Sequence, residues 1–213
     1  MGLPAAYYSD SLVQVYLGDS REIVPLLPQA DLLLTDPPYG IGGWSASGGN
    51  SLGQDEADAI NGWDVAPDPE TLRMVVAHAK YAVVWGGNFL CGALGPWHSP
   101  LVWDKRNRGM HYADGEIAWT NFAFGTLRIL ELPLQATEVR GHRKHPTQKP
   151  VALMTWCIEQ SKTTGLILDP FLGSGSTLVA AKVLNLRAIG IECVEAYAEV
   201  AAERCRQNVL GLL

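Results

Sequence analysis

An apolar run ends abruptly in the stretch TDPPYG, residues 35–40, where a carboxylate, two prolines and an aromatic ring follow one another. The preceding DLLL is typical of a buried strand that stops at a turn. Pro37 and Pro38 hold the backbone extended and donate no hydrogen bond, because proline fixes its own φ and restricts the residue before it. The Asp36 carboxylate and nearby carbonyls therefore form a rigid row of acceptors beside the Tyr39 ring. The same residues also fit an ordinary strand-to-loop turn.

A second stretch that could bind a ligand is LILDPFLGSGSTLVAAKVL, residues 166–184. A strand is predicted to end at Asp169 and a helix to begin at Ser176, with Gly173 and Gly175 in the turn between them. Glycines let a ligand approach the backbone closely, and a helix N-terminus offers free N–H groups to an anion. The spacing is neither that of a dinucleotide-binding turn nor that of a P-loop. A tight turn without a ligand has the same pattern.

The strand predicted after this helix ends in an acid, Glu192. An acid at that place commonly binds the ribose hydroxyls of a nucleotide or nucleoside, although a surface acid would look the same. Asp36, Asp169 and Glu192 all lie at carboxyl ends of predicted strands. That edge is where open α/β sheets bind their ligands.

The elements that must position these residues alternate along the chain. Strands are predicted at residues 12–19, 31–35, 81–85, 100–103, 115–120, 166–169 and 187–192, and helices at 20–28, 69–80, 149–162, 176–185 and 194–208. Ser20 is expected to cap the first helix. The alternation predicts an α/β fold with a single doubly wound, mostly parallel sheet.

Composition limits the class of protein. A chain of 213 residues with 47% apolar side chains can bury a full core, so residues 1–213 are expected to form one domain. No apolar run approaches the ~18 residues of a membrane span, and no secretory signal pattern is found at the start. The four cysteines are scattered without C-x-x-C spacing. That favours a reducing cytoplasm and argues against a zinc site or a disulfide framework.

Two segments differ from the average composition. Residues 40–63 are rich in Gly, Ser, Asn and Asp and are predicted to be a mobile loop at the active site. Residues 104–149 hold eight basic and five acidic side chains, a local charge of 8 − 5 = +3, which leaves −6 − 3 = −9 for the remainder. A solvated face would have this pattern, and so would a stripe that contacts phosphates. The candidate nucleic-acid contacts are Lys105, Arg106, Arg108, Arg140, Arg143 and Lys144.

The order of three motifs resembles a known family. TDPPYG comes first, HPTQKP at 145–150 follows the basic region, and DPFLGSGST at 169–177 comes last. This order resembles the β-class DNA amino-methyltransferases, which transfer a methyl group from S-adenosylmethionine to the exocyclic nitrogen of adenine or cytosine. The resemblance runs from about Val15 to Arg206 and includes GDS, VVWGGNF and LVWDK. It implies a circularly permuted Rossmann-like sheet, in which the strands at Asp36 and Asp169 are neighbours although 169 − 36 = 133 positions separate them.

The resemblance assigns the parts of S-adenosylmethionine to particular residues. Lys149 is similar to the family's basic residue at the methionine carboxylate, Glu192 to its ribose-binding acid, and Asp19 to the residue that takes the adenine amino group. A surface lysine and a helix-capping aspartate are the simpler alternatives for Lys149 and Asp19. The remaining cofactor contacts implied are Asp36, Asp169, Phe171, Gly173, Ser174, Gly175, Ser176 and Thr177.

The resemblance also explains why TDPPYG suits chemistry on an amine. The lone pair of an exocyclic amine is delocalised into the ring, so the nitrogen is a poor nucleophile. Asp36 and the Pro37 carbonyl would accept both amine hydrogens and favour a more tetrahedral nitrogen, in a backbone that Pro38 keeps rigid. Tyr39 would stack on a base swung out of the duplex. These catalytic roles require no metal.

Several functions remain open from the sequence. In the resembled family Asp at the position of Asp36 accompanies adenine N6 methylation, whereas Ser is usual for cytosine N4. RNA methylation and a catalytically silent, nucleic-acid-binding partner subunit are further alternatives. A dehydrogenase is disfavoured because G-x-G-x-x-G is missing. The segment 121–144 is predicted to recognise the target, and its small size predicts either a short recognition sequence or a homodimer. The sequence identifies no endonuclease partner of a restriction-modification pair.

Overall fold

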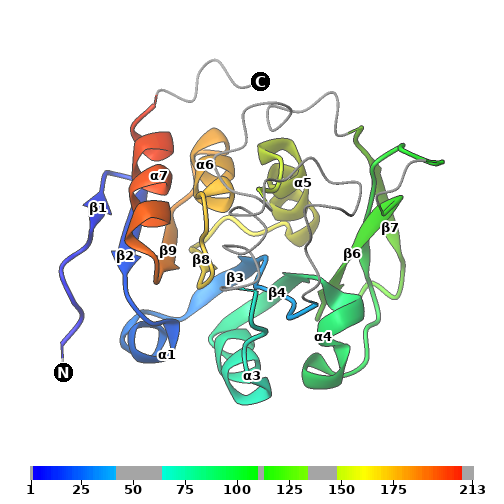
Figure 1. Ribbon diagram of the computed structural model, residues 1–213, viewed down its shortest axis with the longest axis horizontal. Coiled ribbons are helices and arrows are strands. Elements are labelled where there is room, and N and C mark those ends of the chain that lie inside the picture. Colours follow the sequence, from blue (N-terminus) through cyan, green and yellow to red (C-terminus); the bar gives the residue numbers. More distant parts are fainter. Residues whose placement is uncertain (1, 42–63, 110–112, 134–147, 208–213) are drawn as a thin grey trace, which may run out of the picture.

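The protein is one sheet covered by helices on both faces, as Figure 1 shows. The computed structural model describes residues 2–41, 64–109, 113–133 and 148–207. Within these ranges the sheet has nine strands in the order β1-β2-β9-β8-β3-β4-β6-β5-β7. The predicted α/β fold with one doubly wound sheet is confirmed.

The bounds of the elements follow the predicted alternation closely. The strands are β1 (Tyr8–Ser9), β2 (Val13–Leu17), β3 (Ala30–Thr35), β4 (Ala79–Trp85), β5 (Leu101–Asp104), β6 (Gly115–Thr120), β7 (Arg128–Glu131), β8 (Ile167–Asp169) and β9 (Ala188–Glu192). The helices are α1 (Ser20–Ile23) with the 3-10 turn η1 (Val24–Leu26), α3 (Pro69–Ala77), α4 (Gly87–Leu94), α5 (Val151–Ser161), α6 (Ser176–Val183) and α7 (Glu195–Arg206).

Strand pairing divides the sheet into two parts. Strands β2, β9, β8, β3 and β4 pair in parallel, which the βα alternation predicts. Beyond β4 the sheet is mixed, because β6 runs antiparallel to both β4 and β5 while β7 is parallel to β5. The sequence predicts no strand between residue 120 and HPTQKP, so the segment 121–144 was expected to lie after the last strand of that region. This expectation is wrong, because β7 lies inside the segment. This strand has four residues and is largely exposed, so it carries no clear hydrophobic alternation.

The two motif strands are neighbours. Leu32 of β3 is paired with Ile167 of β8, and Leu33 with Leu168, in parallel register. This pairing confirms the permuted order, and it brings the end of β3 against Asp169, whose Oδ1 accepts a 2.7 Å hydrogen bond from the Thr35 hydroxyl. The carboxyl edge of the sheet thus collects residues from both ends of the chain.

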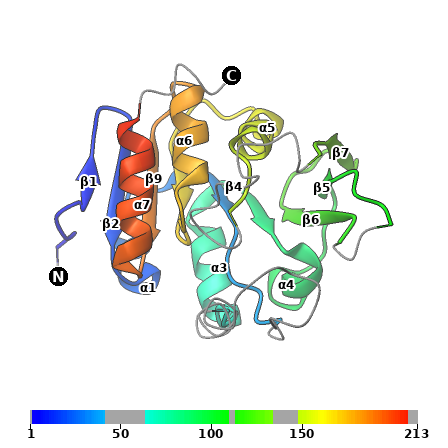
Figure 2. The same ribbon diagram turned by 45° about the horizontal axis from the view of Figure 1, so that its top comes forward.

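Side-chain alternation along the central strands builds a core on each face of the sheet. Leu32 and Leu34 of β3 and Trp85 of β4 pack in the core covered by α5, α6 and α7. Leu33 and Val84 point the other way, into the core covered by α1, α3 and α4. Figures 1 and 2 show these two helix layers on opposite sides of the sheet. Because both faces are covered, the strands read as continuous apolar runs in the sequence.

Two helix starts differ from the predictions. The N-cap of α1 is Asp19, which accepts a hydrogen bond from the Arg21 N–H, and Ser20 is the first helical residue. The helix α4 was not predicted at all, because it is glycine-rich and its N-cap, Gly86, has the left-handed φ of 74°. The structure thus extends β4 directly into α4, and this junction faces the candidate site.

All four cysteines have free thiols, Cys157 and Cys205 being buried and Cys91 and Cys193 exposed. Among the described residues no three His, Cys, Asp or Glu side chains come together as metal ligands. No helix in the described part of the chain is long and apolar enough to cross a membrane.

Candidate active site

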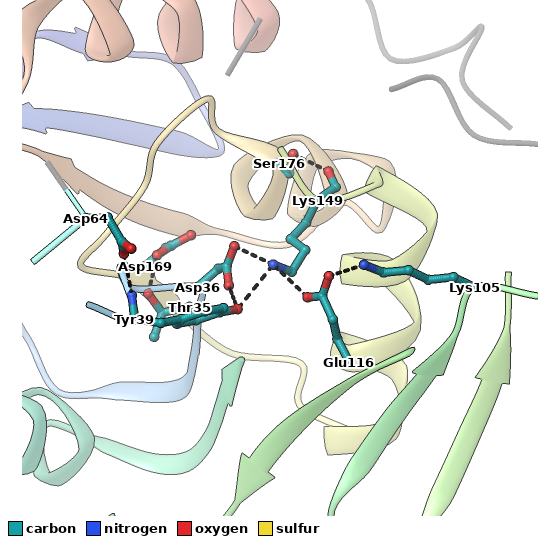
Figure 3. Close-up of polar contacts among 9 residues, drawn as sticks. All are labelled: Thr35, Asp36, Tyr39, Asp64, Lys105, Glu116, Lys149, Asp169 and Ser176. Carbon is teal, nitrogen blue, oxygen red and sulfur yellow. Dashed lines mark hydrogen bonds and ion pairs between the residues drawn. The ribbon is translucent and has the colours of Figure 1, made fainter. Parts of the chain in front are cut away.

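Asp36 lies directly beyond the carboxyl end of β3, and both of its oxygens have partners within the chain. Oδ2 lies 2.6 Å from Nζ of Lys149, and Oδ1 accepts a hydrogen bond from the Tyr39 hydroxyl. Nζ of Lys149 also donates to the Tyr39 oxygen over 3.3 Å. Pro37 is buried and Pro38 half-buried, so the backbone after Asp36 is packed against the protein. Figure 3 shows the three polar side chains converging.

Contacts at both of its ends hold Tyr39 in place. Its backbone N–H and that of Gly40 each donate a 3.0 Å hydrogen bond to Oδ1 of Asp64. Its ring stacks on Phe89 of α4 with centroids 5.3 Å apart. A Cβ at Gly86 would come within 2.1 Å of the Tyr39 ring, so only glycine fits this close approach. The predicted mobile loop 40–63 falls mostly outside the described residues, and Asp64 ties its two flanks together.

Lys149 is a buried cation. Its side chain is only 7% exposed, and its ammonium lies between Asp36 and Oε2 of Glu116, the latter at 3.0 Å. The rings of Tyr39 and Trp85 lie 5.7 and 6.0 Å from the same nitrogen. Burial alone would disfavour the charge, but the Asp36 and Glu116 carboxylates outweigh it and hold the pKa of Lys149 well above its ordinary value. A surface lysine, the simpler alternative, is therefore wrong.

Glu116 is a site residue that sequence reasoning missed. It projects from β6 and binds Nζ of Lys105 at 2.5 Å through Oε1, with Lys149 on the other side. Burial would raise its pKa, but the two ammonium groups lower the pKa of Glu116 to about 2. A row of alternating charges thus runs from Lys105 through Glu116 and Lys149 to Asp36, as Figure 3 shows, and its formal charges cancel.

Asp169 is buried at the end of β8, 3% exposed, and its charge has no cation beside it among the contacts described. Besides the Thr35 hydroxyl, the Phe171 N–H donates to its Oδ1 over 3.2 Å. Burial raises the pKa of Asp169 to about 6, although the hydroxyls of Thr177 and Thr35 work against the shift. A carboxylate held in this way would gain from a cation in the adjoining pocket.

The pocket beside Asp169 contains about 330 Å³ of empty space, part of it open to solvent. It brings together residues from both motifs and from HPTQKP. Its lining comprises Asp36, Gln148, Lys149, Met154, Asp169, Phe171, Leu172, Gly173, Ser174, Ser176 and Thr177. Eight of the predicted cofactor contacts are in this lining: Asp36, Lys149, Asp169, Phe171, Gly173, Ser174, Ser176 and Thr177.

Arg204 of α7 braces the turn before α6. Its Nη1 donates to the Ser174 carbonyl over 2.7 Å, to the Ser174 hydroxyl over 3.0 Å and to the Ser176 hydroxyl over 3.2 Å. The Ser176 hydroxyl in turn donates to the Lys149 carbonyl over 2.7 Å. These contacts fix the start of α6 against the segment before α5 that carries Lys149. The first N–H groups of α6 have no partner within the helix. Sequence reasoning missed Arg204 as well.

Glu192 and Asp19 share the carboxyl edge but lie outside the pocket lining. The Gly173 N–H donates to Oε2 of Glu192 over 2.7 Å and the Val194 N–H to Oε1 over 2.9 Å. Asp19 accepts from the Arg21 side chain and is 36% exposed. The Gly18 N–H reaches the Glu192 carbonyl over 2.9 Å, so the two acids come from adjoining strand ends. A ligand extending from the pocket along this edge would meet both.

The described members of the predicted nucleic-acid stripe have acidic partners. Arg106 pairs with Glu131 over 3.0 Å, and Arg108 with Asp104 over 2.6 Å. Lys105 is turned inward to Glu116, with its side chain 14% exposed. Arg140, Arg143 and Lys144 lie outside the described residues, so their role stays a prediction.

Fold and site together define a class of protein. An α/β sheet of permuted order carries a ligand pocket at its carboxyl edge, and a buried carboxylate with an aromatic ring borders that pocket. Residues 74–203 match the family model described as DNA methylase, that of the N6 and N4 methyltransferases.

Comparison with known sequences agrees with this match. The chain is 30% identical over 203 aligned positions to YubD of Escherichia coli (strain K12), covering 88% of this chain and 87% of that protein. It is 28% identical over 261 positions to the type II methyltransferase M.ScaI of Streptomyces caespitosus, covering 97% and 85% of the two chains. The chain belongs to the DNA methylase family.

Solved structures share the fold. The structure titled as the M1.HpyAVI–SAM complex superposes with a TM-score of 0.60 at 23% identity, over 92% of this chain and all of that one. The PvuII DNA methyltransferase, titled cytosine-N4-specific, gives a TM-score of 0.63 at 18% identity, over 95% and 89% of the two chains. At these identities the likeness establishes the fold alone.

Proposed function

We propose that this protein transfers a methyl group from S-adenosylmethionine to the exocyclic amine of a flipped base in DNA, with adenine N6 as its target. The observation that carries the proposal is the position of Asp36. Its side chain borders the pocket that the Asp169 turn and the start of α6 enclose, so one group can bind an amine at the mouth of a cofactor site.

The chemistry of the pocket suits the proposed cofactor. Asp169 is a buried carboxylate in need of a cation, which the ammonium of the methionine end provides. The first N–H groups of α6 suit a carboxylate, and Glu192 and Asp19 follow along the same edge for ribose and adenine. When bound, S-adenosylmethionine supplies an electrophilic methyl group on a sulfonium. These assignments of residues to parts of the cofactor rest on the hydrogen-bonding groups of the residues and on their order along the edge of the sheet.

Asp36 and the aromatic residues would act on the acceptor base. The Asp36 carboxylate would accept a hydrogen bond from the amine, which aims the nitrogen lone pair. It would also stabilise the positive charge that develops on nitrogen as the new C–N bond forms and the bond from the methyl carbon to sulfur breaks. The excess proton then leaves the nitrogen for water. Tyr39 and the half-exposed Phe89 provide flat surfaces for a base outside its stack. The aromatic residues would act by holding the base, and Asp36 by orienting the amine and stabilising its charge.

The choice of adenine over cytosine rests on the charge of Asp36. Both bases present an exocyclic amine, so the arrangement of acceptors alone does not separate them. A carboxylate stabilises positive charge on nitrogen better than the hydroxyl of a serine would. The resemblance of TDPPYG to adenine-type motifs points the same way. Cytosine N4 methylation is the second candidate, and the fold shared with the PvuII enzyme is compatible with it.

The proposed substrate is DNA read over a short site. Few residues are available for base contacts in the segment 121–144, and β7 takes up part of it. A short recognition sequence, or a homodimer that adds surface, follows from this. The proposed location is a reducing cytoplasm, which fits the four free thiols. A monomer that reads a site of about eight or more fixed base pairs would contradict this part of the proposal.

The test is incubation of the purified protein with isotope-labelled S-adenosylmethionine and unmethylated plasmid DNA, followed by digestion and mass spectrometry of the nucleosides. Labelled N6-methyladenine is expected. Labelled N4-methylcytosine alone would overturn the base choice but leave amine methylation standing. Label found only in a parallel RNA incubation would overturn DNA as the substrate, and no label in either would overturn the enzymatic proposal.

A further inference from the structure

The acceptor that the proposed reaction needs is already occupied. Lys149 and the Tyr39 hydroxyl fill the two oxygens of Asp36. An exocyclic amine that approaches Asp36 competes with these two donors for the lone pairs of the carboxylate. The Tyr39 hydroxyl can turn its hydrogen toward the base or to water while the ring stays packed on Phe89, because a neutral hydroxyl is cheaply rehydrated. The Lys149 ammonium is charged and buried, so it needs another carboxylate wherever it moves.

Glu116 is placed to be that carboxylate. Its Oε2 lies 3.0 Å from Nζ of Lys149, yet within the described part of the chain this buried oxygen accepts no hydrogen bond. The distance is that of a hydrogen bond and only the direction is unfavourable, so a rotation about the last bonds of Lys149 would align the two groups. Oε1 of the same carboxylate is paired with Lys105, whose ammonium competes with Lys149 for Glu116.

We propose that Glu116 is a positioning residue that takes over the Lys149 ammonium when the amine of the target base displaces it from Asp36. This inference rests on the proposed function, because it assumes that Asp36 binds the amine. The exchange moves Lys149 between two carboxylates that it already touches, so the ammonium keeps an ionic partner throughout, while Asp36 receives the hydrogen bond of the amine in its place. Glu116 thereby favours bases that carry an exocyclic amine without touching the base.

The prediction can be tested by binding, without turnover. Two duplexes carry the mapped methylation site, one with the natural target base and one with the analogue lacking the exocyclic amine (unsubstituted purine for adenine, pyrimidin-2-one for cytosine). The dissociation constant of the analogue duplex divided by that of the natural duplex is the preference for the amine. This ratio measures how well the amine competes for Asp36. In Glu116→Gln the ammonium has no second carboxylate, so the preference for the amine should fall about tenfold, a typical coupling between contacting charged groups. Affinity for the analogue should stay unchanged.

A second variant, which is expected to change the preference for the amine in the opposite direction, keeps the test decisive if Glu116→Gln folds poorly. Lys105→Met removes the cation that competes for Glu116, so Glu116 should hold Lys149 more strongly and the preference for the amine should rise. If Lys105 also binds a DNA phosphate, its removal would weaken both duplexes equally and leave the ratio unaffected. Glu199→Gln is the matched control, since this carboxylate of α7 pairs with Arg206 and Tyr7, away from the site. Its ratio should equal that of the wild type.

The outcomes separate this inference from the proposed function. A wild-type protein that binds both duplexes equally would mean that Asp36 does not hold the amine, and both would fall. Discrimination by the wild type that Glu116→Gln retains would overturn the exchange alone, as would an unchanged or lower ratio in Lys105→Met. Equal weakening of both duplexes by Glu116→Gln would assign Glu116 a structural role only.

Discussion

Asp36 carries the proposed chemistry and at the same time belongs to a buried ion pair with Lys149. Burial raises its pKa above the ordinary value, and the Lys149 ammonium offsets part of that shift. The carboxylate therefore has two functions: it would bind the amine of the base, and it pairs with the Lys149 ammonium. A substitution at Asp36 separates them, because Lys149 keeps Glu116 as a partner.

We predict that Asp36→Ala loses nearly all methyl transfer, on the order of a hundredfold or more, as when a preorganised transition-state contact is removed. Cofactor affinity should fall only modestly, since Asp36 forms one wall of the pocket. Methyl-transfer rates and calorimetric titration with S-adenosylmethionine measure the two effects. If cofactor binding disappears together with activity, Asp36 serves mainly to hold the cofactor.

Asp169 is the second residue whose charge state matters, because it decides how much the residue contributes to the stability of the fold. Its pKa of about 6 in the folded protein lies above the ordinary value of 3.8. Between these values the folded state binds more protons than the unfolded state, so this group's contribution to stability falls as pH rises from about 4 to 6 and stays low above.

We predict that Asp169→Asn stabilises the protein without ligand at pH 7 by up to roughly 3 kcal/mol, the equivalent of a two-unit pKa shift. The gain should vanish near pH 4, where Asp169 itself is protonated. Cofactor affinity at pH 7 should be lost, since an amide cannot pair with an ammonium. Urea unfolding of both proteins from pH 4 to 7 measures the difference. A gain that does not depend on pH would show that Asp169 is not charged in the fold.

At the scale of elements, the junction between the glycine turn and α6 depends on α7. Gly175 caps α6 with a left-handed φ of 84°, and a Cβ there would lie 2.9 Å from Cβ of Ala201. The residue does not line the pocket. The sequence suggests that glycine is needed here for close approach to a ligand, which stays a prediction, and the structure shows that glycine is also needed for close approach to α7.

We expect Gly175→Val to lower cofactor affinity at least about tenfold and to lower the melting temperature, because both the φ angle and the contact with α7 are strained. Gly92→Val is the control, since Gly92 lies on α4 with no atom near its Cβ position. Calorimetry below both melting temperatures separates binding from unfolding. Unchanged cofactor affinity in Gly175→Val would contradict the proposed place of the turn.

The sequence predicts those elements whose residues carry a local signal. The runs at β3, β8 and β9 are apolar and end in polar residues, so both the strands and their edge could be predicted. The order of motifs then places β3 beside β8. The helix α4 and the strands β1 and β7 were missed, because a glycine-rich helix, a strand of two residues and a short, largely exposed strand have no periodic apolar face.

The residues that support the site were harder to predict than those that line it. Glu116 lies near the start of β6 and Arg204 near the end of α7, where an acid and a basic residue look like ordinary surface charges. Their roles arise only from tertiary contacts, with Lys149 in one case and the Ser174 carbonyl in the other. Local patterns contain no information about such pairs.

At the scale of the whole molecule, charge is unevenly distributed. The formal net charge is −6, which opposes binding to a polyanion, so phosphate contacts must come from a limited set of cations. Two of the described candidates, Arg106 and Arg108, are about half or more exposed but paired with acids. Surface pairs of this kind are weak, so a phosphate can replace the acid.

We predict that the Arg106→Gln, Arg108→Gln double variant binds DNA more weakly and with a smaller dependence on salt. The slope of log Kd against log salt concentration should fall by about 2, roughly 0.9 for each phosphate that is no longer bound. Glu131→Gln should do the opposite and tighten binding, because it removes an acid that repels the backbone and frees Arg106 from its partner. Fluorescence anisotropy with a fixed duplex at several salt concentrations measures both effects. If the double variant keeps the wild-type slope, Arg106 serves only to pair with Glu131 of β7 and Arg108 only to pair with Asp104 of β5, and the phosphates are bound by other cations.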